Sequence, residues 1–428
     1  MINQIRIQKR SLPEWSALLL VVLPLLYSFL TELFGLPRAV RFVSDFLIVV
    51  PMAIIIFRSY LHGRLFVPRI SFAISVVVSV FILYTVIGYI FNYQSFLYYI
   101  WGARNNFRFY FAFLIFVAFF DEEGAEKCLN IIDWMFWVHF VVTVIQYIMG
   151  NEQDFLGGIF GTEKGCNGYT IVFISIVTIK SLLSYMNGSE SALLCFTKCA
   201  VALVVSALAE LKIFFLLFIF ILILSAAITR FSFKKFSLIL ISVLLVSVAY
   251  LILVTQYEHF RNFFSFENLM NELLKENYAS SEDLGRFTSI PTICQRFLTT
   301  LPERLLGMGL GNCDTSTISV FNTAFYDKYV DIHYSIFSVS FLFLETGFIG
   351  LLLFCVFFVV CLIQSAQKLR QKAGNLLFNQ MGVIMSIICF ILMFYNSSLR
   401  TEAGYLVYFV LALPYIGMNK SVYVRHGD

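Results

Sequence analysis

Charged residues are scarce in this sequence. Lys, Arg, Asp and Glu make up 13% of its 428 residues, about half of the share that is usual in globular proteins. Hydrophobic residues make up 60%, and the mean hydropathy is +0.84. A soluble protein cannot bury that much apolar surface, so the composition indicates an integral membrane protein. The net charge of +4 is small and spread along the chain, so nothing points to nucleic acid as a partner.

Histidine is scarce as well, and the chain has no metal-binding pattern. The five histidines are scattered, and the nine cysteines show no metal-ligand spacing. We therefore predict no metal and no other cofactor. Most cysteines fall in or beside apolar runs and are typical of small buried hydrophobic residues. Cys294 and Cys313 lie in a polar stretch, where they form either a disulfide, if that stretch faces an oxidising compartment, or two free thiols.

Apolar runs of about 20 residues, the length that spans a bilayer, recur along the chain. The first is too long for the core of a signal peptide and lacks a small-residue cleavage site, so we expect it to remain as a span. The shortest, at 107–120, reaches full length only if 96–106 extends it. The sequence predicts an all-α polytopic membrane protein, one membrane domain over 1–428. About twelve spans are expected, at 15–34, 40–57, 70–91, 107–120, 129–149, 167–186, 191–209, 212–230, 236–256, 334–363, 376–396 and 401–418.

The distribution of Lys and Arg predicts the orientation of these spans. Positive charge is enriched in cytoplasmic loops. With a cytoplasmic N-terminus, the inner loops and termini hold sixteen Lys and Arg residues and the short outer loops hold seven. Both termini are therefore expected in the cytoplasm, and Lys198 is expected to extend along its helix towards the inner face. The seven outer residues are Arg38, Arg41, Arg104, Arg108, Lys164, Lys212 and Arg400.

One long polar tract, 257–333, separates the ninth and tenth spans, and this orientation places it outside. Apolar residues between Phe263 and Leu274 recur at helical spacing and predict an amphipathic helix on the membrane surface. A second helical stretch is expected from 284 to 306, interrupted at Pro291. We therefore expect an ordered, partly helical external loop that carries the functional site.

Arginines in this loop are candidates for phosphate binding. A guanidinium is permanently charged and binds phosphate oxygens through two parallel bonds. Arg286 either serves this purpose or is an ordinary exposed loop arginine. Arg296 is either a second ligand or part of a solvated helix face. Gly307, Gly309 and Gly311 form either a plain turn or a backbone cradle for a phosphate.

Further candidates lie where the loop meets the membrane helices. His333 is either a general base or phosphate ligand, or an anchor at the helix end. Glu345 lies inside the tenth span, where an acidic residue is costly; it is either catalytic or a buried partner of an arginine. Glu210 and Lys212 share a short outer hairpin that either reaches the site or only separates two helices. Arg104 belongs to a wider group of outer charges with Arg108, Arg400 and Glu402.

Together these features resemble the O-antigen polymerase and O-antigen ligase superfamily. The topology covers the whole chain, and the motif-level similarity covers mainly 285–350, with a fainter one at 209–212. Where members often carry an arginine in the hairpin between the seventh and eighth spans, this chain has Lys212. The motifs are Gly285-Arg286-Phe287, the Gly-x-Gly-x-Gly of Gly307, Gly309 and Gly311, His333-Tyr334, and Leu344-Glu345-Thr346-Gly347-Phe348-Ile349-Gly350.

The resemblance implies a metal-independent, inverting glycosyltransferase of the bacterial cytoplasmic membrane that uses undecaprenyl-pyrophosphate-linked glycans as donor and acceptor. Arg286 would bind the donor pyrophosphate, with Lys212 beside it. His333 or Glu345 would orient or deprotonate the acceptor hydroxyl. A chain-length regulator is a further partner that the resemblance suggests. We favour a polymerase that makes O-antigen or capsule. A ligase acting on lipid A-core, a lipid-linked oligosaccharide flippase and a noncatalytic scaffold stay as alternatives.

Overall fold

The computed structural model describes residues 11–61, 71–229, 283–316 and 318–416, with the isolated residues 247, 251 and 255. Its regular elements in these ranges are all helices. The predicted span 236–256, apart from those isolated residues, and the predicted amphipathic helix at 263–274 lie outside the described residues. The helical class of the prediction is confirmed.

Seven described helices are long and apolar enough to cross a membrane. They correspond to predicted spans at similar positions, which supports a membrane-embedded protein. Their bounds are Leu12–Glu32, Arg38–Phe57, Phe72–Phe91, Glu122–Ile148, Cys166–Asn187, Ser338–Gln371 and Leu376–Tyr395.

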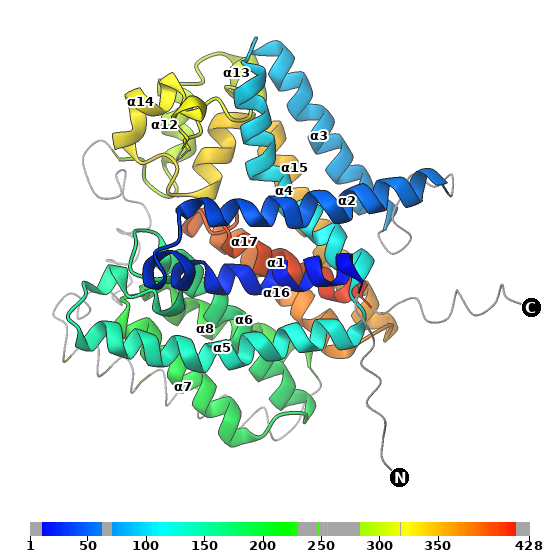
Figure 1. Cartoon of the computed structure of the whole chain (residues 1–428), viewed down its shortest axis with the longest axis vertical. Coiled ribbons are helices and arrows are strands. Elements are labelled where there is room, and N and C mark those ends of the chain that lie inside the picture. Colours follow the sequence, from blue (N-terminus) through cyan, green and yellow to red (C-terminus); the bar gives the residue numbers. More distant parts are fainter. Residues whose placement is uncertain are drawn as a thin grey trace, which may run out of the picture.

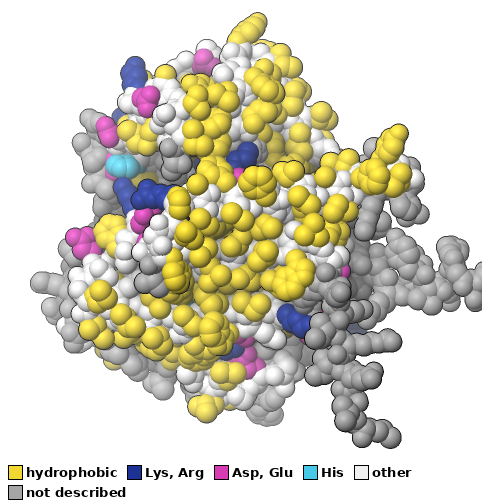
Figure 2. Space-filling view, viewed as in Figure 1, with side chains coloured by type: hydrophobic (Ala, Val, Ile, Leu, Met, Phe, Trp, Pro, Cys, Tyr) yellow, Lys and Arg dark blue, Asp and Glu magenta, His cyan; other side chains and the backbone are white. Residues whose placement is uncertain are grey.

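The helices form one bundle, with α1, α2 and α5 side by side on the face seen in Figure 1. Apolar side chains cover most of this face (Figure 2), as expected for helices in contact with lipid. The first elements are α1 (Leu12–Ser28, continued as a π turn over Phe29–Leu33), a 3₁₀ turn (Arg38–Phe42), α2 (Val43–Leu61), α3 (Phe72–Phe91), α4 (Phe96–Phe119) and α5 (Glu122–Ile148). They are followed by α6 (Cys166–Asn187), α7 (Ala192–Leu208) and α8 (Lys212–Ile228).

Helix α4 is one continuous helix of 24 residues, so residues 96–106 do extend the predicted short span. It is not among the seven apolar candidates. Arg104 and Arg108 lie in its middle, one turn apart. Because residues at i and i+4 share a helix face, both guanidinium groups emerge from the same side of α4.

The described part of the polar tract 257–333 contains two short helices, α12 (Ser289–Arg296) and α13 (Leu301–Leu306), before residue 317. The predicted interruption at Pro291 is wrong. Pro291 occupies the first turn of α12, where a proline costs no helical hydrogen bond. The chain breaks after Arg296 instead, because Thr300 begins α13 with a capping box in which Thr300 and Glu303 bond each other's backbone N–H groups.

The chain then passes through Ser319–Phe321, α14 (Ala324–Tyr329) and Val330–Ile332 to α15 (Ser338–Gln371). Figure 1 shows α12, α13 and α14 gathered at one corner of the molecule, next to the start of α15. Helix α15 is broken at Gly347, whose φ of 62° is not helical. Helix α16 (Leu376–Tyr395) packs along α15, and α17 (Ala403–Ala412) with the turn Leu413–Tyr415 returns through the bundle.

A buried ionic cluster joins α5, α6 and α7. The Asp133 carboxylate bonds Lys180 Nζ at 2.6 Å and Lys198 Nζ at 3.1 Å, and Lys198 also contacts Glu190 at 3.3 Å. The sequence predicts that Lys198 extends towards the inner face, and its ammonium is buried with carboxylate partners, one of them in the connection between α6 and α7. These partners offset the cost of burying the charge.

Candidate functional site

Two adjoining cavities open where the end of α1, the starts of α2 and α6 and the middle of α4 meet the connection between α16 and α17. The larger has a volume of about 470 Å³ and the smaller about 230 Å³. Arg41, Ser397, Thr401 and Glu402 line both and form the shared wall. The larger volume lies within the range of small-molecule sites.

The larger cavity is lined by five arginines from three separate parts of the chain. Arg38 and Arg41 come from the 3₁₀ turn before α2, Arg104 and Arg108 from α4, and Arg400 from the α16–α17 connection. All five belong to the outer-loop residues of the sequence prediction. Figure 2 shows Lys and Arg side chains gathered beside Asp or Glu at the left-hand edge of the apolar face. Aromatic side chains complete the lining: Phe42, Trp101, Tyr326, Tyr334 and Phe341.

Arg104 is held by a carboxylate and by aromatic rings. Its guanidinium Nη2 lies 2.7 Å from Asp45 Oδ2, and its Nε lies 3.1 Å from both carboxylate oxygens. The guanidinium carbon is 5.0 Å from the ring centres of Phe42 and Trp101. Trp101 stacks on Phe321 at 4.5 Å. These contacts fix Arg104 as part of the cavity wall.

Arg108 and Glu402 form a buried pair at the boundary between the cavities. Arg108 Nη1 lies 3.4 Å from Glu402 Oε1, and the Tyr169 hydroxyl donates to Glu402 Oε2. Arg38 and Arg41 contact Glu163, at 2.7 and 3.9 Å. Four of the five arginines thus have a carboxylate within 4.0 Å.

Arg400 differs from the other four. Among the described residues, no carboxylate lies within 4.0 Å of its guanidinium, and its buried Nε has no hydrogen-bond partner. Its guanidinium carbon lies 3.3 Å from the ring centre of Phe341. Burial lowers the pKa of Arg400, while the carboxyl groups of Asp314 and Glu345 act in the opposite direction. An arginine stays protonated through such a shift.

The charges of the larger cavity do not cancel. Its lining has five arginines and two carboxylates, those of Asp314 and Glu402, a balance of +3. Counting Asp45 and Glu163, which bond Arg104 and Arg38 from its edge, leaves +1. The surplus arises because Arg38 and Arg41 share the single carboxylate of Glu163. Among the described residues, Arg400 has no carboxylate within 4.0 Å, although the charge of Asp314 acts on it. A bound anion would be stabilised by the net positive charge of this lining.

The glycine turn 307–311 shapes the cavity rather than lining it. The backbone N–H groups of Gly307, Gly309 and Gly311 donate to Glu303 O, Glu345 O and Glu345 Oε1. Each of the three glycines has a positive φ, of 71°, 96° and 88°. A side chain on Gly311 would meet Tyr98 O at 2.0 Å. Because all three N–H groups are used within the protein, the turn acts as a structural joint between α4 and α15.

Glu345 is the anchor of this turn. It is fully buried, and its Oε1 accepts from the N–H groups of Gly311 at 2.9 Å and Cys313 at 3.3 Å. Cys313 and the following Asp314 line the larger cavity. Glu345 itself is not among the lining residues, so its contacts assign it a positioning role. Cys294 and Cys313, whose pairing the sequence left open, are both free thiols.

His333 and Arg286 line neither cavity. His333 has a left-handed backbone, with φ 53°, and its Nδ1 is 2.8 Å from Oδ1 of the buried Asp283. The next two residues, Tyr334 and Ser335, line the larger cavity. The Arg286 guanidinium lies 5.0 Å from the ring centre of Tyr395, at the end of α16. His333 is therefore next in the chain to lining residues, whereas Tyr395, beside Arg286, lies outside the lining.

The other predicted site residues divide into two groups. Arg104 lines the larger cavity. Arg296 is exposed on the last turn of α12, and Glu210 and Lys212 form the tight turn between α7 and α8; none of these three lines either cavity. Among the described residues, no group of three or more His, Cys, Asp and Glu side chains is arranged to hold a metal ion.

Sequence reasoning missed Arg38, Arg41, Asp314 and Glu163 as site residues. The arginines were visible only as part of the outer-loop charge count. Their position at the ends of predicted spans was the signal that could have grouped them. No family model, curated protein or solved structure matches this chain.

Proposed function

We propose that this protein is a polysaccharide polymerase. It would join undecaprenyl-pyrophosphate-linked repeat units into O-antigen or capsular polysaccharide at the outer face of the bacterial cytoplasmic membrane. The proposal includes about twelve spans, cytoplasmic termini and an external loop at 257–333. The observation that carries it is the arginine-lined cavity with a net positive charge, in a bundle of apolar helices.

A pyrophosphate group suits this cavity chemically. Guanidinium forks bind phosphate oxygens through paired, charge-assisted bonds. Arg400 has no carboxylate within 4.0 Å among the described residues, and Arg41 lies on the wall shared with the smaller cavity. The lipid tail of such a substrate would remain in the bilayer, beside the exposed apolar side chains of α2 and α3.

The reaction would be a single displacement. An acceptor sugar hydroxyl attacks the anomeric carbon of the donor, the bond to the pyrophosphate oxygen breaks, and the electron pair leaves with pyrophosphate. Arg400 and its neighbours stabilise the charge that develops on that oxygen. The hydroxyl proton passes to His333, which Asp283 orients through Nδ1. The configuration at the anomeric carbon is inverted, and the charge stabilisation comes from arginine side chains.

The surface glycan of a deletion strain of the native host tests this function. A gel profile that shows molecules capped with a single repeat unit supports the polymerase, because ligation survives while polymerisation is lost. Bare core with polymer accumulating on the lipid carrier identifies a ligase instead. An unchanged profile would refute both activities.

Complementation of that strain with point variants tests the site. Arg400→Ala should reduce polymer formation by about 10²-fold, the effect of removing one preorganised donor to a developing oxyanion. Arg296→Ala, a matched loss of an exposed arginine outside the cavity, should leave the profile unchanged. Arg286→Ala tests whether Arg286, which the resemblance implies as a ligand of the donor pyrophosphate, is needed for polymer formation. Normal chain lengths in the Arg400→Ala strain, with the variant present in the membrane, would remove Arg400 from the mechanism.

A further inference from the structure

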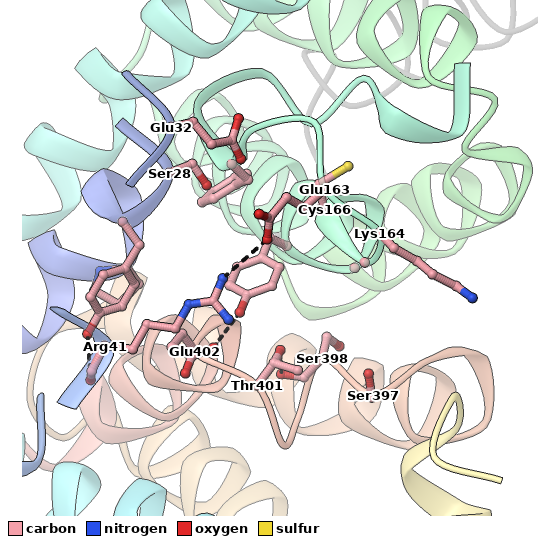
Figure 3. A pocket seen from close by; sticks show the side chains of 16 residues that line it. Ser28, Glu32, Arg41, Glu163, Lys164, Cys166, Ser397, Ser398, Thr401 and Glu402 are labelled. Carbon is pink, nitrogen blue, oxygen red and sulfur yellow. Dashed lines mark hydrogen bonds and ion pairs between the residues drawn. The ribbon is translucent and has the colours of Figure 1, made fainter. Parts of the chain in front are cut away.

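The smaller cavity has a different chemical character from the larger one. It is lined by the end of α1, the start of α6 and the α16–α17 connection, as Figure 3 shows. Its charged groups are the carboxylates of Glu32, Glu163 and Glu402 and the cations Arg41 and Lys164. The balance is −1, against +3 for the lining of the larger cavity. The charge balance therefore disfavours phosphate binding in the smaller cavity and favours it in the larger one.

One buried polar atom of this lining has no hydrogen-bond partner among the described residues. It is Ser398 Oγ, and Ser398 is 2% exposed. A second unpaired atom, Asn396 Nδ2, lies behind the lining, where it would be 3.3 Å from a side-chain carbon added to the lining residue Gly168. Buried polar groups are normally hydrogen-bonded, so the unpaired hydroxyl of Ser398 indicates a ligand that forms hydrogen bonds.

The remaining lining offers an aromatic surface and further hydroxyl partners. The rings of Phe160 and Tyr169 lie 5.5 Å apart, and both residues line the cavity. Ser28 and Thr401 add hydroxyl groups (Figure 3). Carboxylates accept hydrogen bonds from hydroxyls, while hydroxyls and amides can bond in either direction. The volume of about 230 Å³ is below that of drug-sized sites, which suits a single small polar ring.

We propose that the smaller cavity is a binding subsite for an uncharged, hydroxyl-rich sugar of the acceptor glycan. This rests on the proposed polymerase function. The shared wall of Arg41, Thr401 and Glu402 would place that sugar directly beside the pyrophosphate compartment. The carboxylates Glu32 and Glu163 would disfavour an acidic sugar at this position. The acceptor specificity is therefore set by residues of α1, α6 and the α16–α17 connection rather than by the external loop.

The test uses the full-length protein in lipid nanodiscs with two probes. One is undecaprenyl pyrophosphate. The other is the repeat-unit oligosaccharide of the native host, freed of lipid and phosphate by mild acid and followed by saturation-transfer NMR. Ser398→Ala should weaken oligosaccharide binding about 2- to 10-fold, the value of one neutral hydrogen bond, and Glu32→Gln should weaken it as well. Neither change should alter undecaprenyl pyrophosphate binding.

Matched controls keep the result specific. Ser319→Ala and Glu126→Gln change exposed residues that line neither cavity, and both should bind the oligosaccharide like the unaltered protein. Arg400→Ala should show the reverse pattern, with weaker undecaprenyl pyrophosphate binding and unchanged oligosaccharide binding.

The two proposals fail in different ways. If undecaprenyl pyrophosphate binds but Ser398→Ala leaves oligosaccharide affinity unchanged, the subsite is refuted and the polymerase stands. If the oligosaccharide binds through Ser398 but undecaprenyl pyrophosphate does not bind, the polymerase is refuted and the sugar site stands. Binding of Mg²⁺ or Ca²⁺ that is lost in Glu32→Gln would identify a cation site and overturn the sugar assignment.

Discussion

Glu345 offers the sharpest test of how this site is built, because its structural and catalytic roles predict opposite results. Its Oε1 accepts from two buried N–H groups, those of Gly311 and Cys313. Glu345→Ala leaves both donors unpaired. At roughly 1–3 kcal/mol for each unsatisfied buried group, the loss in free energy of unfolding is about 2–6 kcal/mol.

Glu345→Gln should behave differently. The amide keeps a carbonyl oxygen where Oε1 lies, so both N–H groups retain an acceptor. The loss should then not exceed about 1 kcal/mol per bond, because each bond keeps an oxygen acceptor. A folded protein with a modestly lower melting temperature is expected, and its glycan product should remain polymeric.

Two measurements decide between the roles: the melting temperature of the purified protein in detergent, and the gel profile of glycan from the complemented strain. Low yield or early melting of Glu345→Ala, with a stable and active Glu345→Gln, supports the positioning role. A Glu345→Gln protein that melts like the unaltered protein and makes no polymer would refute it, because only proton transfer at Glu345 would then explain the loss. Glu126→Gln is the matched exposed control.

Further predictions concern the glycine turn and the loop thiols. Gly311→Ala should lower the free energy of unfolding by about 1–3 kcal/mol more than Gly150→Ala does. Both glycines have a positive φ, but only at Gly311 would the added side-chain carbon meet a neighbouring atom, Tyr98 O, at 2.0 Å. Equal melting temperatures of the two variants would contradict this. In single-cysteine variants, a membrane-impermeant maleimide should label the partly exposed Cys294 and spare Cys313, where burial raises the pKa of the thiol. Faster labelling of Cys313 would refute its burial.

The sequence already contained the class of the fold. Long apolar runs predict helices in a membrane because a bilayer offers the backbone no hydrogen-bond partners, and the seven apolar helices agree with those runs. The sequence predicts helical structure over 284–306 but not the start of α13, although Thr300 and Glu303 form a capping box there. The predicted break at Pro291 is wrong because a proline costs no hydrogen bond in the first turn of a helix, and the sequence pattern did not show that the helix begins at Ser289.

The site depended on tertiary structure. Arg41, Arg104 and Arg400 are far apart in the chain, and their meeting in one cavity follows from how α2, α4 and the α16–α17 connection pack. Which arginine has no carboxylate within 4.0 Å among the described residues depends on where Asp45, Glu163 and Glu402 lie in the folded chain, and the side-chain distances show this.

The sequence by itself determined that this is a helical membrane protein, since composition and periodicity follow from the solvent each residue must face. Only the tertiary structure decided that Glu345 holds a turn and that Arg400 faces a cavity. Hydrogen bonds and ion pairs act over a few ångströms, and residues such as Gly311 and Glu345, 34 positions apart, reach that range only when the chain is folded.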